Sequence, residues 1–317
     1  MFLCVSPNPA IDKRMTLPEL VPGEIHRART VQALPGGKST HVAMVLKALG
    51  AEPHWIGMCG GSTGSALLAG LDHLGIKAHV SSIAAETRTN LEIIDGTGVV
   101  TEIREPGESV SAAELAAFER ACDAWFQEGG EAGVVIFSGS LPLGAPPEFY
   151  AMLIAAAGKA GCRTFLDTSG EPLKLALASH PHFVKPNRDE AAGVLNSAIT
   201  SGDAAANALS QFLSCGACSV ALSLGAEGLL YAPGKSGPIL FAPAIPVAAK
   251  SSVGCGDAAL AGFAYATASG SSPEGALRTA VACAAANCLA DSPGAVEKET
   301  IDKFQCQVRI ESFKSGP

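Results

Sequence analysis

The second half of the chain alternates short apolar runs with helical segments, and this rhythm restricts the possible folds more than any other feature. Residues 134–137 are an apolar run that ends at Ser138-Gly139-Ser140, and residues 147–160 carry a helical pattern that stops at Gly161. The same order continues with strands expected at 163–166, 183–185 and 219–224, and with helices expected at 171–178 and from Asp189. Strands that alternate with helices predict an α/β fold, with a mostly parallel sheet between two helical layers.

The first hundred residues have a different pattern. Short apolar stretches at 15–17, 25–32, 90–95 and 99–104 are separated by turn residues, and Asp95-Gly96-Thr97-Gly98 is typical of a hairpin turn. We therefore expect the segments 11–35 and 86–106 to form a small accessory sheet. No linker divides the chain, so residues 1–317 are expected to form one domain into which these two segments are inserted.

The composition argues against several classes of protein. Hydrophobic residues make up 48% of the chain and charged residues 16%, which favours a large core over disorder. The apolar runs fall short of the roughly 18 residues that a membrane span needs, and the N-terminus lacks the pattern of a signal peptide. The formal charge of −8, without a basic stripe, argues against nucleic acid as a partner. Ten scattered cysteines are typical of reduced thiols in a cytoplasmic protein.

A glycine turn, Val253-Gly254-Cys255-Gly256-Asp257, precedes a helical run at 258–269. Glycines at the start of a helix let backbone N–H groups converge on an anion, and the helix dipole adds positive potential there. Asp257 lies in the first helical turn, where it could take a proton from a hydroxyl that attacks a phosphoryl group. The alternative is that Asp257 only complements the helix dipole. The turn by itself leaves both interpretations open.

A second glycine turn, Pro35-Gly36-Gly37-Lys38, leads into another helical segment. Gly36 and Gly37 permit close approach of the backbone to a ligand, and Lys38 offers a positive charge to an anionic group. His41, three residues further on, offers a donor to a sugar hydroxyl. The alternative is a tight turn with a solvated lysine and a packed histidine.

Nine short motifs follow one another along nearly the whole chain. They are Asn8-Pro-Ala-Ile-Asp12, Pro35-Gly-Gly-Lys38, Gly60-Gly-Ser-Thr-Gly64, Thr87-Arg-Thr-Asn90, Glu105-Pro-Gly107, Ser138-Gly-Ser-Leu-Pro142, Lys185-Pro-Asn-Arg-Asp-Glu190, Ser223-Leu-Gly-Ala-Glu-Gly228 and Gly254-Cys-Gly-Asp257. In this order they resemble the ribokinase-like carbohydrate kinases of the phosphofructokinase B family, especially its 1-phosphofructokinase and tagatose-6-phosphate kinase group. The resemblance implies a ribokinase-like three-layer fold in which segments 11–35 and 86–106 form a β-sheet lid.

The resemblance further implies an ATP-dependent kinase that converts a ketohexose phosphate (fructose 1-phosphate, fructose 6-phosphate or tagatose 6-phosphate) to a bisphosphate. Asp257 corresponds to the family's general base, and the amides of Gly254, Cys255 and Gly256 correspond to its anion hole. Asn187 and Glu190 match the element that positions magnesium beside the ATP phosphates. The nucleotide-binding residues that the resemblance implies are Lys185, Asn187, Ser223, Gly225, Gly228 and Asn287.

On the acceptor side, Asp12 resembles the carboxylate that binds sugar hydroxyls. The other residues that the resemblance places on this side are Arg27, Gly36, Gly37, Lys38, His41, Arg88 and Ser140. The planar fork of Arg88 fits the oxygens of the phosphate already on the sugar, whereas a surface ion pair is the alternative for this arginine alone. Closure of the lid is expected to exclude water, which would otherwise hydrolyse ATP. Relatives often pair through the lid, so a homodimer is a further expectation by analogy.

Three positions depart from the family pattern. Ser39 replaces a glycine, and His41 replaces an asparagine that contacts the sugar, which leaves the acceptor open. Lys250 lies where many relatives have a monovalent-cation site, so potassium is an open alternative. Two other functions also stay open. One is a kinase of an unphosphorylated sugar or nucleoside; the cations on the acceptor side argue against it. The other is a non-catalytic sensor of sugar phosphates; the presence of an intact Asp257 argues against it.

Overall fold

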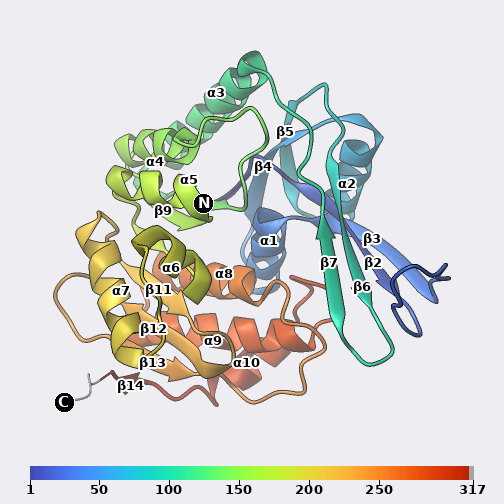
Figure 1. Ribbon diagram of the computed structural model, residues 1–317. Helices are drawn as coiled ribbons and strands as arrows, with labels where there is room; N and C mark the ends of the chain where they lie inside the picture. Colours follow the sequence, from blue (N-terminus) through green and yellow to red (C-terminus); the bar gives the residue numbers. More distant parts are fainter. Residues whose placement is uncertain (314–317) are drawn as a thin grey trace.

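The computed structural model describes residues 1–313 and contains two separate β-sheets (Figure 1). The larger sheet has, in spatial order, β14 (Glu311–Ser312), β13 (Leu240–Pro243), β12 (Gly228–Ala232), β11 (Val220–Ser223), β10 (Phe183–Val184), β9 (Arg163–Asp167), β8 (Val134–Ser138), β1 (Phe2–Ser6), β4 (Pro53–Cys59) and β5 (Lys77–Ser82). Neighbouring strands are parallel from β5 to β11 and antiparallel from β11 to β14. The mostly parallel sheet predicted from the sequence is therefore confirmed.

Helices cover both faces of this sheet. On one face lie α1 (Lys38–Ala48), α2 (Gly61–His73), α8 (Cys255–Ala268), α9 (Pro273–Leu289) and α10 (Lys298–Gln305); on the other lie α3 (Ala112–Gly129), α4 (Phe149–Lys159), α5 (Gly170–Ala176), α6 (Arg188–Leu195) and α7 (Gly202–Ser214). Strand β1 shows how the sequence divides the core. Cys4 packs in the first layer, whereas Leu3 and Val5 pack in the second, because successive side chains of a strand point to opposite faces.

The smaller sheet contains β3 (Thr30–Gly36), β2 (Ala10–Thr16), β6 (Arg88–Ile94) and β7 (Val100–Arg104) in that order. In Figure 1 it projects from the main body as a flat extension. Strand β2 pairs with β3 antiparallel and with β6 parallel, so it joins the two segments that the sequence singled out. The hairpin predicted at Asp95 is also confirmed, since one carboxylate oxygen of Asp95 accepts the N–H groups of Thr97 and Val99. We call this sheet the lid.

One strand of the lid was misplaced by the sequence pattern. A strand was expected at 25–32, but β3 runs from Thr30 to Gly36, and Ile25 lies almost fully exposed outside it. The register explains the difference, because Thr16 at the end of β2 pairs with Thr30, and the pairing of β3 with β2 begins only at Thr30. Among the residues that the structure describes, no helix is both long enough and apolar enough to cross a membrane.

Candidate active site

The glycine turn at Gly254 begins helix α8 and places Asp257 in its first turn. Gly254 has a φ of 79°, a left-handed conformation that glycine adopts without strain. The amide of Asn287, on α9, holds this turn: its nitrogen donates to the carbonyl of Val253 at 2.8 Å, and its oxygen accepts the N–H of Gly294 at 2.8 Å. The side chain of Asn287, predicted to lie near a nucleotide, is thus occupied by contacts that fix the turn.

Lys185 lies directly beside this turn. Its ammonium nitrogen is 3.2 Å from the position that a Cβ on Gly256 would occupy, so glycine leaves room for the ammonium group there. The side chain is 3% exposed and forms an ion pair of 2.9 Å with Asp167. A fixed positive charge therefore lies next to the N-terminus of α8, and both features favour an anionic ligand.

Asp167 joins Lys185 to Lys38. Its two carboxylate oxygens lie 2.9 Å from the ammonium nitrogens of these lysines, and its side chain is 1% exposed. Burial alone would raise the pKa of Asp167, but the two ammonium groups outweigh it and hold that pKa below its usual value. The pKa of Lys38 is raised, because the carboxylates of Asp167, Asp257 and Glu190 outweigh the effect of its own burial.

His41 connects Asp12 to Asp257. Its Nδ1 atom lies 2.8 Å from a carboxylate oxygen of Asp257, and its Nε2 atom lies 3.0 Å from one of Asp12. Burial would lower the pKa of His41, but the two carboxylates raise it to about 10, so the ring is an imidazolium at neutral pH and donates from both nitrogens. The pKa of Asp12 is correspondingly lowered by His41 and by Asn90, against the effect of its burial.

The lid supplies Asp12 and fixes its orientation. Its carboxylate accepts a hydrogen bond of 2.8 Å from the amide of Asn90 on the neighbouring strand β6. A Cβ on Gly36 would lie 2.1 Å from the carboxyl carbon of Asp12, so only glycine lets the carboxylate occupy this place. Gly37 has a φ of 88° and donates its N–H weakly to the same carboxylate, at 3.4 Å.

Ser39, the first departure from the family pattern, lies inside helix α1 and needs no glycine conformation. Its hydroxyl lies 2.5 Å from the carbonyl of Val5 and 2.8 Å from that of Ser138. Val5 is the second-last residue of β1, and Ser138 is the last residue of β8. The serine therefore ties α1 to the carboxyl edge of the sheet.

The other acceptor-side residues lie further out. The guanidinium of Arg88 donates to the carbonyls of Asn8 and Glu105, at 3.2 and 2.9 Å for its two terminal nitrogens. The Ser140 hydroxyl accepts from the amide of Asn8 at 3.1 Å, which brings Ser140 to the same corner. Arg27 lies on the exposed segment between β2 and β3. A cavity of about 230 Å³ lies beside Arg88, but three of its seven lining residues are glutamates, which suits an anionic ligand poorly.

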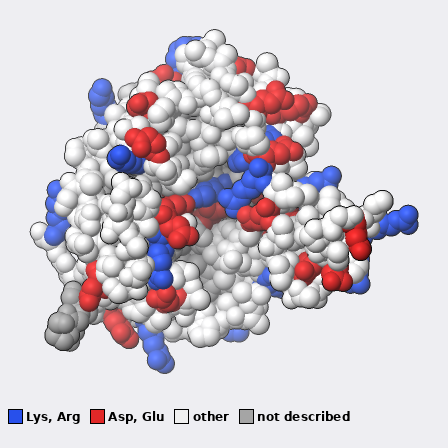
Figure 2. Space-filling model, in the orientation of Figure 1, with Lys and Arg blue, Asp and Glu red and all other residues white. Residues whose placement is uncertain are grey.

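The expected nucleotide-binding residues gather at the ends of β10 to β12. Asn187 and Ser223 are paired across a β-bridge, and Gly228 begins β12. Gly225 begins the exposed 3-10 turn between them with a φ of 62°. Figure 2 shows acidic and basic side chains around the hollow between the main body and the lid.

Asn187 and Glu190 cap helix α6. The Asn187 side chain accepts the N–H of Glu190 at 2.8 Å, and the Glu190 carboxylate accepts the N–H of Asn187 at 2.9 Å. The second oxygen of Glu190 lies 3.7 Å from the ammonium of Lys38. No cluster of three or more potential metal ligands occurs within residues 1–313. Glu190 is the one carboxylate of this motif, which fits a magnesium ion that is held mainly by water and phosphate oxygens and does not fit an all-protein cage.

Comparison with known proteins identifies the family. The family model of the pfkB family carbohydrate kinases matches residues 8–300. The chain belongs to this family. It is 35% identical over 269 residues to a 1-phosphofructokinase of Xanthomonas campestris pv. campestris, which covers 83% of each chain. It is 33% identical over 263 residues to a 1-phosphofructokinase of Rhodobacter capsulatus, covering 83% of this chain and 82% of the other.

Solved structures agree with this assignment. Phosphofructokinase-2 of Escherichia coli in complex with fructose-6-phosphate has a TM-score of 0.88 at 27% identity, covering 97% of this chain and 98% of that one. Ribokinase of Arabidopsis thaliana, at 21% identity and a TM-score of 0.74, covers 96% and 98% and shares the fold. The predicted ribokinase-like fold and family are confirmed, and the chain is an ATP-dependent sugar-phosphate kinase.

Asp167 was not among the site residues predicted from the sequence. It ends the buried strand β9, next to the carboxyl ends of β8 and β10, where ligands bind in open α/β sheets. That position was a usable signal, but the partners Lys38 and Lys185 lie 129 and 18 residues away in sequence, and only the fold brings them together. The link from His41 to Asp257 was missed for the same reason.

Proposed function

We propose that this kinase transfers the γ-phosphoryl group of ATP to a hydroxyl of a ketohexose phosphate, with Asp257 as the general base. The observation that carries the proposal is the position of Asp257, 6% exposed, in the first turn of α8 and joined through His41 to the lid carboxylate Asp12. A carboxylate beside a helix N-terminus that favours anions, where the lid meets the main body, supports this role as proton acceptor.

Different residues of the chain act on the acceptor and on the nucleotide. Asp12 accepts hydrogen bonds from acceptor hydroxyls, and the imidazolium of His41 holds Asp12 and Asp257 at a fixed separation. The amides of residues 254–256 and the ammonium of Lys185 face the transferring phosphoryl group, where preorganised donors stabilise the developing charge most. Glu190 and Asn187 would hold a magnesium ion largely through water, and that ion would supply positive charge beside the nucleotide phosphates.

The proposed acceptor class rests mainly on Arg88, which interacts electrostatically with Asp12. Arg88, at the start of the lid strand β6, has a planar fork that suits a phosphate, whereas Arg27 lies on the exposed segment between β2 and β3. The ammonium group of Lys38 is less available to a sugar phosphate than the sequence implied, because it forms an ion pair with Asp167. The named relatives are 1-phosphofructokinases, and a phosphofructokinase-2 relative was solved with fructose-6-phosphate. We therefore favour a ketohexose phosphate over a free sugar or nucleoside.

The decisive experiment measures ADP release with fructose 1-phosphate, fructose 6-phosphate, tagatose 6-phosphate, fructose and a nucleoside. We expect turnover on one or more ketohexose phosphates, and a loss of at least ~10³-fold in kcat for Asp257→Asn with nucleotide binding retained. Asp72→Asn, an exposed aspartate on α2, is the matched control and should keep full turnover. Turnover of only free sugars or nucleosides refutes the acceptor class. Binding of sugar phosphates without any ADP release points instead to the sensor.

Two further features of the proposal concern the surroundings of the site. Lys250 forms an ion pair of 2.7 Å with Asp291 in the segment where potassium was an open alternative, and a relative was solved with potassium. Turnover measured with and without KCl tests that cation.

The lid exposes Val31, Val99 and Ile103, which favours pairing of two copies through this sheet. A tetrameric inhibited form is known for one relative, and sedimentation of this chain with and without ATP measures its own assembly.

A further inference from the structure

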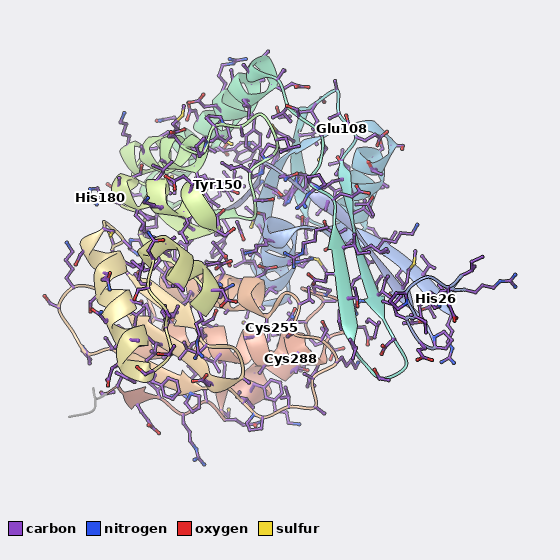
Figure 3. The ribbon with its side chains drawn as sticks, viewed as in Figure 1. His26, Glu108, Tyr150, His180, Cys255 and Cys288 are labelled. Carbon is purple, nitrogen blue, oxygen red and sulfur yellow. The ribbon has the colours of Figure 1, made fainter. Side chains whose placement is uncertain are left out.

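Two cysteines meet behind the glycine turn. Cys255 is the first residue of α8 and Cys288 lies in the last turn of α9, and their Sγ atoms are 3.1 Å apart (Figure 3). Both side chains are half-buried, so solvent reaches this place. All ten cysteines lie within the described residues, and no other pair brings its sulfur atoms within hydrogen-bonding distance.

We propose that Cys255 and Cys288 form a redox modification site, in which a hydroperoxide converts the two thiols to a disulfide that disables the anion hole. The site is independent of the phosphoryl-transfer chemistry, but its effect on turnover rests on the function proposed above.

The backbone around the two sulfurs already holds them together. The N–H of Lys250 donates to the carbonyl of Cys288 at 2.8 Å. Next to Cys288, the amide of Asn287 donates to the carbonyl of Val253 at 2.8 Å and lies 3.5 Å from the sulfur of Cys255. These contacts hold residues 250–255 against the end of α9. Bond formation therefore needs a movement of only roughly 1 Å between the sulfurs rather than a rearrangement of the chain.

The hydrogen bond between the thiols also divides their roles. Either thiol can donate in this contact. The contact lowers the pKa of Cys288, and the same contact together with burial raises the pKa of Cys255. Cys288 is then the nucleophile, because the thiolate is the reactive form. Cysteines buried alone, such as Cys59 and Cys283, have pKa values raised to about 12 by burial and are expected to be inert.

The chemistry balances in two steps. The Cys288 thiolate attacks one peroxide oxygen, the O–O bond breaks, and the products are a sulfenic acid and hydroxide. The Cys255 sulfur then attacks the sulfenic sulfur, its thiol proton leaves with the hydroxyl group as water, and the S–S bond forms. Two electrons pass from the two sulfurs to the peroxide. A dithiol reductant reverses the change by thiol–disulfide exchange.

The disulfide acts on the site because Cys255 belongs to it. The amide of Cys255 is one of the proposed anion-hole donors, and Asp257 follows two residues later in the same helical turn. Bond formation draws Cys255 toward α9 and so shifts the donors and the base relative to the reacting atoms, and a misplacement of ~1 Å costs up to about 100-fold in rate. We expect oxidation to lower kcat by up to that order.

The experiment treats the full-length protein with hydrogen peroxide, blocks free thiols with iodoacetamide and digests with trypsin. The expected product is a disulfide between the peptides 251–278 and 279–298, with the loss of two hydrogen atoms. Because the second peptide also contains Cys283, fragment ions must show Cys283 alkylated and Cys288 linked. Dithiothreitol should restore turnover in parallel with loss of the linked peptide.

Cys288→Ser is the test variant, and Cys306→Ser, an exposed cysteine of the C-terminal region, is the matched control. Cys288→Ser should keep its basal turnover and resist peroxide, whereas Cys306→Ser should behave as the native chain; Cys288→Ala replaces Cys288→Ser if the latter folds poorly. Absence of the 255–288 link overturns the proposal, as does equal inactivation of the Cys288 variants. A complete link with full turnover overturns the regulatory effect. If no sugar phosphate is phosphorylated before oxidation, the proposed function fails, while the linked peptide still decides on the modification site.

Discussion

Replacement of His41 by asparagine tests the charge state of the bridge between Asp12 and Asp257. Asparagine is the residue that the family pattern implies at this position, and it is neutral at every pH. The native imidazolium lies between two carboxylates, at 2.8 and 3.0 Å, and the pKa of His41 is raised from 6.5 to about 10 in the folded protein. Lys38, which also interacts with Asp257, is unchanged in the variant.

The magnitude follows from proton linkage. Between pH 6.5 and about pH 10 the folded chain holds a proton on His41 that the unfolded chain has released. The stabilisation by this proton is fully present below pH 6.5 and is lost as the pH rises through about 10. Within that window the stability falls by about 1.4 kcal/mol per pH unit. From about pH 7.5 to about pH 9 the native chain should therefore lose ~2 kcal/mol that His41→Asn does not lose.

The assay is urea unfolding of both proteins across this pH range, and the measured quantity is the difference between their free energies of unfolding. Groups common to both chains, such as the cysteines, cancel in that difference. His73→Asn, an exposed histidine at the end of α2, is the control and should track the native chain. A difference that stays constant from about pH 7.5 to about pH 9 refutes the reasoning, because the His41 ring would then be neutral in the folded protein.

Three other substitutions test separate parts of the site. Asp167→Asn leaves two ammonium groups without their shared buried carboxylate, so unfolding free energy should drop by ~3–5 kcal/mol in urea titrations, and an unchanged midpoint would contradict the buried network. Gly36→Ala puts a Cβ where the Asp12 carboxyl lies. The KM for the sugar phosphate should therefore rise at least ~10-fold, while the KM for ATP stays within about 2-fold. Equal changes in both KM values would count against Asp12 as a sugar ligand. Arg88→Lys keeps the charge but loses the planar fork, so steady-state kinetics should show a higher KM for the phosphorylated acceptor and an unchanged kcat, and native KM would remove Arg88 from the phosphate site.

The fold could be predicted from the sequence wherever its periodicity was unbroken. Strands β8 and β9 and helix α4 lie within a few residues of the expected segments, because buried parallel strands are apolar throughout and end at glycine or polar residues. The lid was harder to place. Its strands are half-exposed, so hydrophobicity marks them weakly, and the start of β3 depends on its register with β2.

The site could be predicted only in part, for a related reason. The local pattern of residues identified the glycine turn with Asp257, and the family resemblance identified Asn187 and Glu190 as a magnesium element; the helix cap that these two residues form was not predicted. Contacts between distant segments were not visible in the motifs. His41 was expected to reach a sugar, but its two ring nitrogens lie against Asp12 and Asp257, which are 29 and 216 residues away.

The alternation of charge across the cleft explains how Asp12 and Asp167 can stay ionised close together. Burial would raise the pKa of each carboxyl group, but His41 lowers the pKa of Asp12 and the two lysines lower the pKa of Asp167. Here a cation separates each acid from the next: His41 lies between Asp12 and Asp257, and Lys38 lies between Asp167 and Glu190. We infer that these cations serve first to hold the buried carboxylates in place. On this proposal Arg88, in the lid strand β6, is better placed than Lys38 to bind the phosphate of the acceptor, and a substitution at Lys38 should alter kcat more than KM for the sugar phosphate.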